Sequence, residues 1–286
     1  MKTIIYLIIT SLICITLASA TQKISESKKN VILQTTDTKV TSQLLTQSAK
    51  IISDRLKIYG LESFDVSIVA DKGQIKVQLP DNLKVSEIEG LLTSKGELSF
   101  YETFNRKEIA DLLKNNSHLF DLLKSDPKIS PTNSKIGCVA SENLDLINEY
   151  LRSNRLVENC KFFWGMKSEE SLTCLHALKI SNAGKPLLIR SDVETIKSSQ
   201  EKNSQSFKIE IKLNPASSRV WADATKNNLD KPIAIVIDDK VFYDPVVRNT
   251  IESGLCEISG NLSQKEVDYF LALVNNEPLT VNFNLK

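Results

Sequence analysis

The sequence predicts an α+β protein that divides into two subdomains. Segments with helical periodicity and segments with strand periodicity are mixed along the chain, and its 286 residues exceed the usual size of one domain. Hydrophobic residues make up 41% of the chain and charged residues 25%, a composition typical of globular proteins. The 36 Lys and Arg side chains nearly balance the 35 Asp and Glu side chains, so no electrostatic feature indicates binding to nucleic acid.

The first 20 residues have the pattern of an export signal. Lys2 supplies a short basic region, residues 4–17 are apolar, and residues 18–20 are the small residues Ala-Ser-Ala. We therefore expect cleavage after residue 20. The alternative is an uncleaved leader that anchors the chain, because residues 4–20 just reach the roughly 17 to 25 residues of a membrane helix. No later apolar run approaches that length, so no further membrane helix is predicted.

The first subdomain is predicted over residues 31–104, after a flexible lead-in at residues 21–30. Gly60 supplies a stop for its first helix, and Ser86 and Glu89 have the spacing of a capping box that opens its second helix. The predicted elements are strand 31–35, helix 41–59, the hairpin strands 66–70 and 75–79, helix 86–92, and strand 98–101. This order is that of a ferredoxin-like fold, in which the last strand closes the sheet.

The rest of the chain is predicted to form an insertion and a second, mixed α/β subdomain. The insertion covers residues 105–186 and the second subdomain residues 187–286. In the insertion we expect helices 107–123 and 143–151 and strands 160–164 and 173–180. The second subdomain is predicted to contain strand 207–213, helix 215–227, strands 233–237 and 241–243 joined by a turn at Asp238-Asp239, a short helix after Pro245, a strand at 256–258, a helix from the capping box of Ser263 and Glu266 to residue 274, and a final alternating segment 281–285.

An even number of cysteines follows the leader, which is compatible with disulfides in an exported protein. These four are Cys138, Cys160, Cys174 and Cys256. Three pairings are possible, and the sequence does not choose among them. Free buried thiols are the alternative. Their spacing matches no compact metal site, so we predict no metal and no cofactor.

The sequence contains no pattern that indicates an enzyme. His118 and His176 lie in different predicted elements without metal-ligand spacing, and the adjacent Asp238 and Asp239 are turn formers before they are an acid pair. A nucleophile elbow and glycine-rich phosphate loops are absent. We therefore predict a non-enzymatic protein, with an active site that forms only in three dimensions as the alternative.

Ten short segments, in order along most of the chain, resemble the first periplasmic domain of the SecD/SecDF protein-export family. Fused SecDF proteins are the closest in pattern. The segments are ISDRL (52–56), YGL (59–61), IKVQLP (75–80), LSFYET (98–103), FWG (163–165), LHALK (175–179), WADATKNN (221–228), IAIVID (233–238), DPVV (244–247) and ISGN (258–261). Each segment is common by itself, whereas their order is specific. The resemblance implies a ferredoxin-like base followed by a head.

The chain also departs from this family. The family's Gly-Leu-Asp-Leu-x-Gly-Gly motif has no counterpart at residues 31–36, and Asp81 and Asp230 stand where the family usually has Gly. The sequence ends at Lys286, where family members enter their membrane bundle. We therefore expect the base and head of the first periplasmic domain only.

The resemblance implies a function in Sec-dependent protein export. Family members use the proton gradient through membrane-embedded carboxylates, while the head moves relative to the base. A proton relay across lipid needs ionisable groups within membrane helices, so we predict a periplasmic polypeptide-binding module without proton-driven translocase activity of its own. Expected partners are unfolded exported polypeptides and the Sec translocon, either SecY or a full-length SecDF. The alternative is a structural or interaction protein of the envelope that has left the Sec system.

Two groups of residues are candidates for this function. Exposed sheet edges and a hinged cleft between the subdomains are expected to bind an extended polypeptide. The candidate polypeptide contacts beside the Asp238 turn are Phe242, Tyr243 and Pro245. Their rings instead fill the core of the head in the alternative interpretation. The candidate hinge comprises Thr103, Phe104, Asn105 and Arg106.

Overall fold

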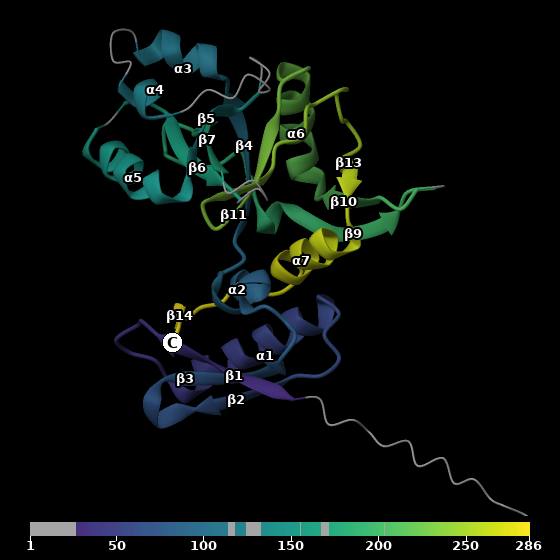
Figure 1. Ribbon diagram of the computed structural model, residues 1–286. Helices are drawn as coiled ribbons and strands as arrows, with labels where there is room; N and C mark the ends of the chain where they lie inside the picture. The colour runs from purple at the N-terminus through teal and green to yellow at the C-terminus, as the bar shows by residue number, and fades with distance from the viewer. Residues whose placement is uncertain (1–26, 114–117, 124–132, 155, 167–171, 203) are drawn as a thin grey trace, which may run out of the picture.

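The computed structural model describes residues 27–113, 118–123, 133–154, 156–166, 172–202 and 204–286. The predicted export signal and most of the predicted lead-in lie outside these residues. Within them the α+β class is confirmed, with a base at one end of the molecule and a larger head at the other (Figure 1). None of the helices in the described ranges combines the length and the apolar composition needed to cross a bilayer.

The base is a four-stranded antiparallel sheet with two helices. Its strands lie in the order β14-β1-β3-β2. The elements are β1 (Lys28–Thr35), α1 (Ser42–Ile58), β2 (Asp65–Val69), β3 (Gln74–Pro80), α2 (Val85–Thr93) and β14 (Phe283–Leu285). Helix α1 begins as predicted, because the Thr41 hydroxyl accepts a hydrogen bond from the Leu44 amide. Its buried face, which includes Leu45, Ile52 and Leu56, joins the core of the molecule.

The fourth strand of the base sheet is not the strand that the sequence predicted. Strand β4 (Leu98–Phe104) was expected to close this sheet, but it pairs with strands of the head. Its place beside β1 is taken by β14, in a register that pairs Leu33 with Leu285. Adjacent residues Phe100 and Tyr101 are both buried, which fits a strand covered on both faces.

The head contains a seven-stranded sheet in the order β5-β7-β6-β12-β11-β4-β8. The strands other than β4 are β5 (Lys135–Ala140), β6 (Cys160–Gly165), β7 (Leu172–Lys179), β8 (Leu188–Ile189), β11 (Ile233–Ile237) and β12 (Lys240–Tyr243). An additional pairing between β7 and β4 closes β7, β6, β12, β11 and β4 into a ring. Facing side chains of these five strands form one buried cluster, which includes Tyr101, Phe163, Leu178 and Val241.

Helices cover the part of this sheet that contains β5 and β7. They are α3 (Arg106–Leu113), α4 (His118–Leu122) and α5 (Leu144–Ser153). Together with the strands they enclose a separate apolar cluster, in which Ile109, Ile147 and Leu175 are fully buried. The predicted helix 107–123 is therefore present as α3 and α4 in the residues that the structure describes.

A second sheet of the head packs against α7. Its strands lie in the order β13-β10-β9. The elements are β9 (Val193–Gln200), β10 (Phe207–Leu213), α6 (Pro215–Asn227), β13 (Leu255–Leu262) and α7 (Gln264–Val274). The predicted capping box of Ser263 and Glu266 opens α7. Helix α7 lies between this sheet and the base helices (Figure 1), and one continuous core cluster extends from Val31 of the base to Ile258 of the head.

Three smaller predictions are wrong. Helix α2 begins at Val85 with Lys84 as its N-cap, so the expected capping box of Ser86 does not form. Strand β1 already starts at Lys28, inside the predicted lead-in. The short helix expected after Pro245 is absent from the described residues, where Val246 instead forms an isolated bridge to Pro232.

A candidate cleft at the junction of base and head

A cleft of about 800 Å³ opens where the chain crosses between base and head. The crossings are residues 94–97, between α2 and β4, and residues 275–282, between α7 and β14. Its apolar lining consists of Leu98, Tyr101, Pro186, Ile189, Pro278 and Phe283. Its charged lining consists of Lys95, Glu97, Arg190, Asp238, Asp239 and Lys240. The cleft therefore combines apolar surface with side chains of both charges.

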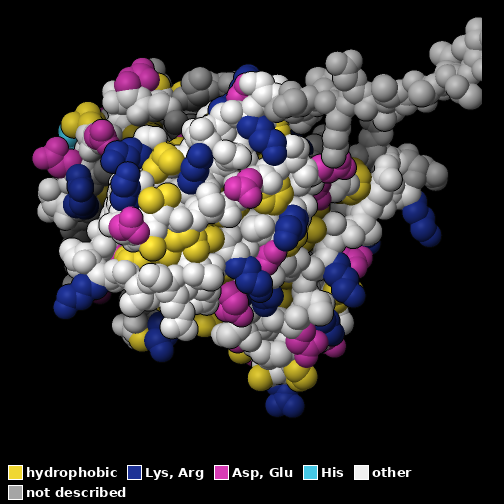
Figure 2. Space-filling model, turned by 90° about the horizontal axis from the view of Figure 1, so that it is seen from below, with side chains coloured by type: hydrophobic (Ala, Val, Ile, Leu, Met, Phe, Trp, Pro, Cys, Tyr) yellow, Lys and Arg dark blue, Asp and Glu magenta, His cyan; other side chains and the backbone are white. Residues whose placement is uncertain are grey.

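Charges of both signs are also mixed on the surface of the molecule seen from the base side. Figure 2 shows Lys and Arg interspersed with Asp and Glu on this face, with small hydrophobic patches between them. No field of a single sign covers the face that the figure shows. This mixture agrees with the near balance of charges in the sequence.

The edge of the seven-stranded sheet contributes to the cleft through β8. This strand pairs with β4 on one side, where Ile189 lies opposite Ser99. Ile189 is 47% exposed, so it offers apolar surface at this edge. The Asp192 carboxylate accepts a hydrogen bond from the Ile189 amide at 2.8 Å. The short β8 edge thus exposes the apolar side chain of Ile189, and the Ile189 amide is already hydrogen-bonded to Asp192.

Arg55 of α1 holds the first crossing from the base side. Its side chain is fully buried, and its Nη1 atom donates to the carbonyl oxygens of Leu91 at 3.3 Å and Ser94 at 2.6 Å. Its Nη2 atom donates to the Lys95 carbonyl at 2.6 Å. Burial lowers the pKa of Arg55 to about 10, and the nearby carboxylate of Asp238 opposes this shift. The guanidinium therefore replaces water as the partner of three carbonyl groups.

Asp238 holds the same crossing from the head side. Asp238 and Asp239 form the predicted turn between β11 and β12, with φ angles of 48° and 62°. The Asp238 carboxylate accepts hydrogen bonds from the Gly96 amide at 3.0 Å and the Glu97 amide at 2.8 Å. Its acceptor atoms are thus engaged by main chain rather than arranged as one half of an acid pair.

The three candidate polypeptide contacts do not line this cleft. Phe242, Tyr243 and Pro245 are half-buried. The Phe242 ring centroid lies 4.9 Å from that of Phe270 in α7, and burial raises the pKa of Tyr243 to about 12. The Pro245 carbonyl accepts a hydrogen bond from the Ile233 amide. These contacts favour the alternative interpretation, in which the rings fill the core, and a role in polypeptide binding stays a prediction.

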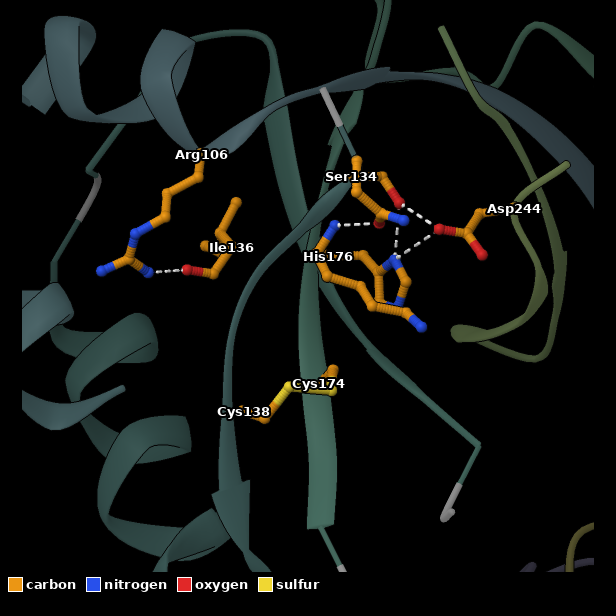
Figure 3. Close-up of a disulfide and its surroundings, with 9 residues drawn as sticks. Arg106, Ser134, Ile136, Cys138, Cys174, His176 and Asp244 are labelled. Carbon is orange, nitrogen blue, oxygen red and sulfur yellow. Dashed lines mark hydrogen bonds and ion pairs between the residues drawn. A yellow bond between two sulfur atoms is a disulfide. The ribbon is translucent and has the colours of Figure 1, made fainter. Parts of the chain in front are cut away.

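The four candidate hinge residues lie together inside the head, from the end of β4 to the start of α3: Thr103, Phe104, Asn105 and Arg106. The buried Thr103 hydroxyl donates to the Pro232 carbonyl at 2.8 Å, and Asn105 caps α3 through its side chain. Arg106 donates to the Ile136 carbonyl of β5 (Figure 3). The chain does not cross between base and head at these residues, so a hinge there stays an untested prediction.

The structure selects one disulfide from the pairings that the sequence left open. Cys138 of β5 and Cys174 of β7 are direct cross-strand neighbours and are joined by a disulfide (Figure 3). Cys160 and Cys256 are free, and burial raises the pKa of each thiol to about 12. Neither free thiol has the lowered pKa of a reactive cysteine.

A buried polar cluster that the sequence analysis missed joins Ser134, His176 and Asp244 (Figure 3). The Ser134 hydroxyl donates to the Asp244 carboxylate at 2.8 Å, and His176 Nδ1 lies 2.8 Å from the same hydroxyl oxygen. Because the only hydrogen of Ser134 goes to Asp244, Nδ1 must carry a proton and donate it to Ser134. Burial lowers the pKa of His176 to about 4, with Lys135 adding to this shift and Asp244 opposing it.

This cluster lacks the arrangement of a catalytic triad. In a triad, one imidazole nitrogen accepts the proton of the nucleophile and the other nitrogen contacts the carboxylate. Here His176 Nδ1 faces both Ser134 and Asp244, and Ser134 is fully buried. The cluster therefore ties three distant segments together. No group of three or more potential metal ligands occurs in the part of the chain that the structure describes, and His118 lies apart beside Tyr150.

Comparison with known proteins finds similarity to one protein family. Residues 176–281 match the family model of the SecDF P1 head subdomain. The protein translocase subunit SecD of Calditerrivibrio nitroreducens is 40% identical over 58 residues, which are 20% of this chain and 11% of that protein. SecD of Petrotoga mobilis is 23% identical over 245 residues, which are 85% of this chain and 46% of that protein. The chain thus spans less than half the length of these two relatives.

A solved structure described as a membrane component SecDF that enhances protein export is also similar. It is 18% identical, with a TM-score of 0.46, and the match covers 90% of this chain and 97% of that one. The family model and the SecD relatives show the relationship independently of this likeness. The chain therefore carries a SecDF P1 head subdomain and is a relative of the first periplasmic domain of the SecD/SecDF protein-export family.

Proposed function

We propose that the chain is a non-enzymatic periplasmic module that binds exported polypeptides and so contributes to Sec-dependent protein export. Its relationship to SecD supports a role in export outside the cytoplasm. The observation that carries the binding function is the cleft between base and head, with its apolar lining and its charges of both signs. The absence of proton-driven translocase activity and cleavage of the leader after residue 20 are further parts of this proposal.

The lining of the cleft suits a client whose sequence varies. Apolar surface such as Ile189 gains free energy from any apolar side chain, and the balanced charges do not select clients of one sign. The short β8 edge supplies main-chain groups, which every polypeptide can pair with. A cleft of this volume accommodates a short extended segment rather than a folded domain.

Site-specific photo-crosslinking during export tests the proposal. A photoreactive amino acid at Ile189 should capture a translocating chain or a component of the Sec translocon, such as SecY or a full-length SecDF. The matched control carries the same group at Val220 of α6, which is 43% exposed but does not line the cleft. A third position, Tyr243, tests the contact predicted from the sequence.

The outcomes separate the proposal from its alternative. Crosslinks to exported chains or translocon components from Ile189, and fewer from Val220, support the cleft as the binding site. Equal capture from both positions, or no capture of such partners from Ile189, contradicts it. Capture of one folded envelope protein instead supports a structural or interaction role outside the Sec system.

A further inference from the structure

Strand β9 is an end strand of the three-stranded sheet, so one of its two edges has no neighbouring strand among the described residues. Its other edge pairs with β10, in a register that places Ile196 opposite Ile211 and Gln200 opposite Phe207. The far ends of these two strands project beyond the helices of the head (Figure 1). An edge strand presents main-chain donors and acceptors to which another extended chain can add. The outer edge of β9 therefore has the geometry of a docking site for a strand.

Two hydrogen bonds show which main-chain groups of β9 face outward. The Ile196 carbonyl accepts a bond from the Asn275 side chain, so the groups of Ile196 point away from β10. The Glu201 amide, just after β9, donates across the hairpin at 2.9 Å, so the groups of Glu201 point towards the paired strand. The direction of these groups alternates along a strand. Both observations therefore place the N–H and C=O groups of Ser198 and Gln200 on the outer edge.

These outward groups are open to a partner. Within the ranges that the structure describes, no hydrogen bond reaches the outer main-chain groups of Ser198 or Gln200. The neighbouring residues Lys197 and Ser199 are exposed, so water has access along this edge. From Ile196 to Gln200 the edge spans about 13 Å of extended chain. It offers two residues whose donors and acceptors are both available.

The other edges of the sheets in the head are shorter, occupied or interrupted. Strand β8 has two residues, and its Ile189 amide is bonded to Asp192. In β5, the Ile136 carbonyl accepts a bond from Arg106. In β13, a register shift at Phe207 interrupts the ladder. Strand β9 therefore offers the longest uninterrupted ladder among these described edge strands.

The β9 edge adjoins the cleft at the junction of base and head. Arg190 lines the cleft, and its Nη1 atom donates to the Val193 carbonyl at the start of β9. Asn275, which is bonded to Ile196, opens the second crossing, and Pro278 of that crossing also lines the cleft. An extended chain that leaves the cleft on this side therefore meets the β9 edge.

The side chains beside this edge favour an unfolded partner. Ser198, Ser199 and Gln200 are small or neutral polar residues, which provide no apolar pocket and no charge to select a client sequence. An unfolded polypeptide satisfies such an edge with its own main chain, whatever its side chains. Lys197 disfavours symmetrical pairing of two copies about this residue, because like charges would meet across the strands.

We propose that the outer edge of β9 binds an extended segment of an exported polypeptide by strand addition, through the main-chain groups of Ser198 and Gln200. This inference rests on the proposed function, and it adds a contact of defined hydrogen-bond pattern to the cleft. A client residue that bonds to the edge must supply an N–H group, so proline is excluded at that place. Strand β9 belongs entirely to the head, so a client held there would move with the head.

Amide hydrogen exchange in the presence of a client tests this pattern. The probe is reduced, carboxymethylated α-lactalbumin at saturating concentration. The outward amides of Ser198 and Gln200 should exchange about 10-fold more slowly in the complex than in the free protein, because they gain hydrogen-bond partners. The amides of Lys197 and Ser199 face β10 and are matched controls in the same strand, so their exchange should not change.

A substitution at one position tests the same contact by affinity. Ser198→Pro removes an outward donor and keeps the bonds to β10, because proline is tolerated in an edge strand where its nitrogen faces solvent. Ser198→Ala is the matched control, since it keeps the donor. The Ser198→Pro variant should bind the probe about 3- to 10-fold more weakly, as measured by fluorescence anisotropy. Protection of Lys197 and Ser199 shows whether each variant retains the strand, and exchange in the parent decides if Ser198→Pro does not fold.

The outcomes separate this inference from the proposed function. Unchanged exchange at Ser198 and Gln200 in the saturated complex, or equal binding by the two folded variants, overturns the β9 site and leaves the proposed function standing. Slow exchange without probe that depends on protein concentration assigns the edge to a second copy and also overturns the inference. A parent protein that binds no probe contradicts the proposed function and the inference together.

Discussion

His176 illustrates how a single side chain makes stability depend on pH. Its imidazole is buried and neutral in the folded protein, with a pKa of about 4 instead of the usual value near 6.5. The unfolded chain therefore binds a proton more readily than the folded one between these values. The contribution of His176 to the unfolding free energy is therefore complete above pH 6.5 and is lost as the pH falls towards 4.

His176→Asn should remove this part of the acid sensitivity. An Asn side chain keeps a donor for Ser134 but does not titrate. The parent protein should lose on the order of 3 kcal/mol of its unfolding free energy through this group between pH 7 and pH 4. Urea denaturation at several pH values measures the difference. Parallel pH profiles of the parent and the variant would contradict a buried neutral His176.

At the scale of elements, the sequence predicted the positions of helices better than the pairing of strands. Helices α1 and α7 were predicted close to their observed ends, because apolar spacing, the stop at Gly60 and the capping box at Ser263 are all local signals. The sheet to which β4 belongs was predicted wrongly. Alternation of apolar residues indicates which face of a strand is buried, but it does not indicate which strand lies beside it. Strand β9 was missed because exposed polar residues interrupt its two buried positions, Val193 and Ile196.

The candidate site was the harder part to predict. The turn at Asp238 was clear from the sequence, but its bonds to Gly96 join residues 142 positions apart. The same holds for Ser134 and Asp244, which are 110 positions apart. Resemblance to the SecD/SecDF family indicated two subdomains and a junction between them. The residues that form the junction became visible only in the folded chain.

The disulfide between β5 and β7 should stabilise the helical part of the head. Strand β5 is at the edge of its sheet and pairs only with β7 among the described strands, so the bond between Cys138 and Cys174 holds an edge that has no second neighbour. Replacing both cysteines by Ala should lower the unfolding free energy by about 2–4 kcal/mol, as measured by urea denaturation.

Thiol titration provides the control for this prediction. Denatured but unreduced protein of residues 21–286 should show two reactive thiols, those of Cys160 and Cys256. Four thiols, or equal stability of the parent and the double variant, would mean that the bond does not form in the purified protein.

At the scale of the whole molecule, base and head share one continuous core and two crossings of the chain. Strand β14 shows how base and head depend on one chain, because it belongs to the base sheet but follows the entire head in the sequence. Its side chain Phe283 is 4% exposed, so the last strand contributes to the core as well as to the sheet.

A chain that ends at Pro278 should keep a folded head and lose the base. It lacks β14, which leaves β1 with an unpaired edge and uncovers the core around Phe283. Limited proteolysis should cut it within β1 to β3, while β4, β11 and the sheet of β9, β10 and β13 stay protected. A chain that lacks only Lys286 is the matched control and should resist cleavage in the base. Resistance of both chains would contradict this role of β14.

The position of β14 also constrains when the protein can acquire its final form. A polypeptide emerges from the ribosome or from a translocon starting at its N-terminus, so β1 becomes available well before its outer neighbour β14. The pairing of Leu33 with Leu285 joins nearly the two extremes of the described chain, and such distant contacts form slowly. Strand β1 therefore keeps an unpaired edge, open to proteases and chaperones, until β14 becomes available to pair with it.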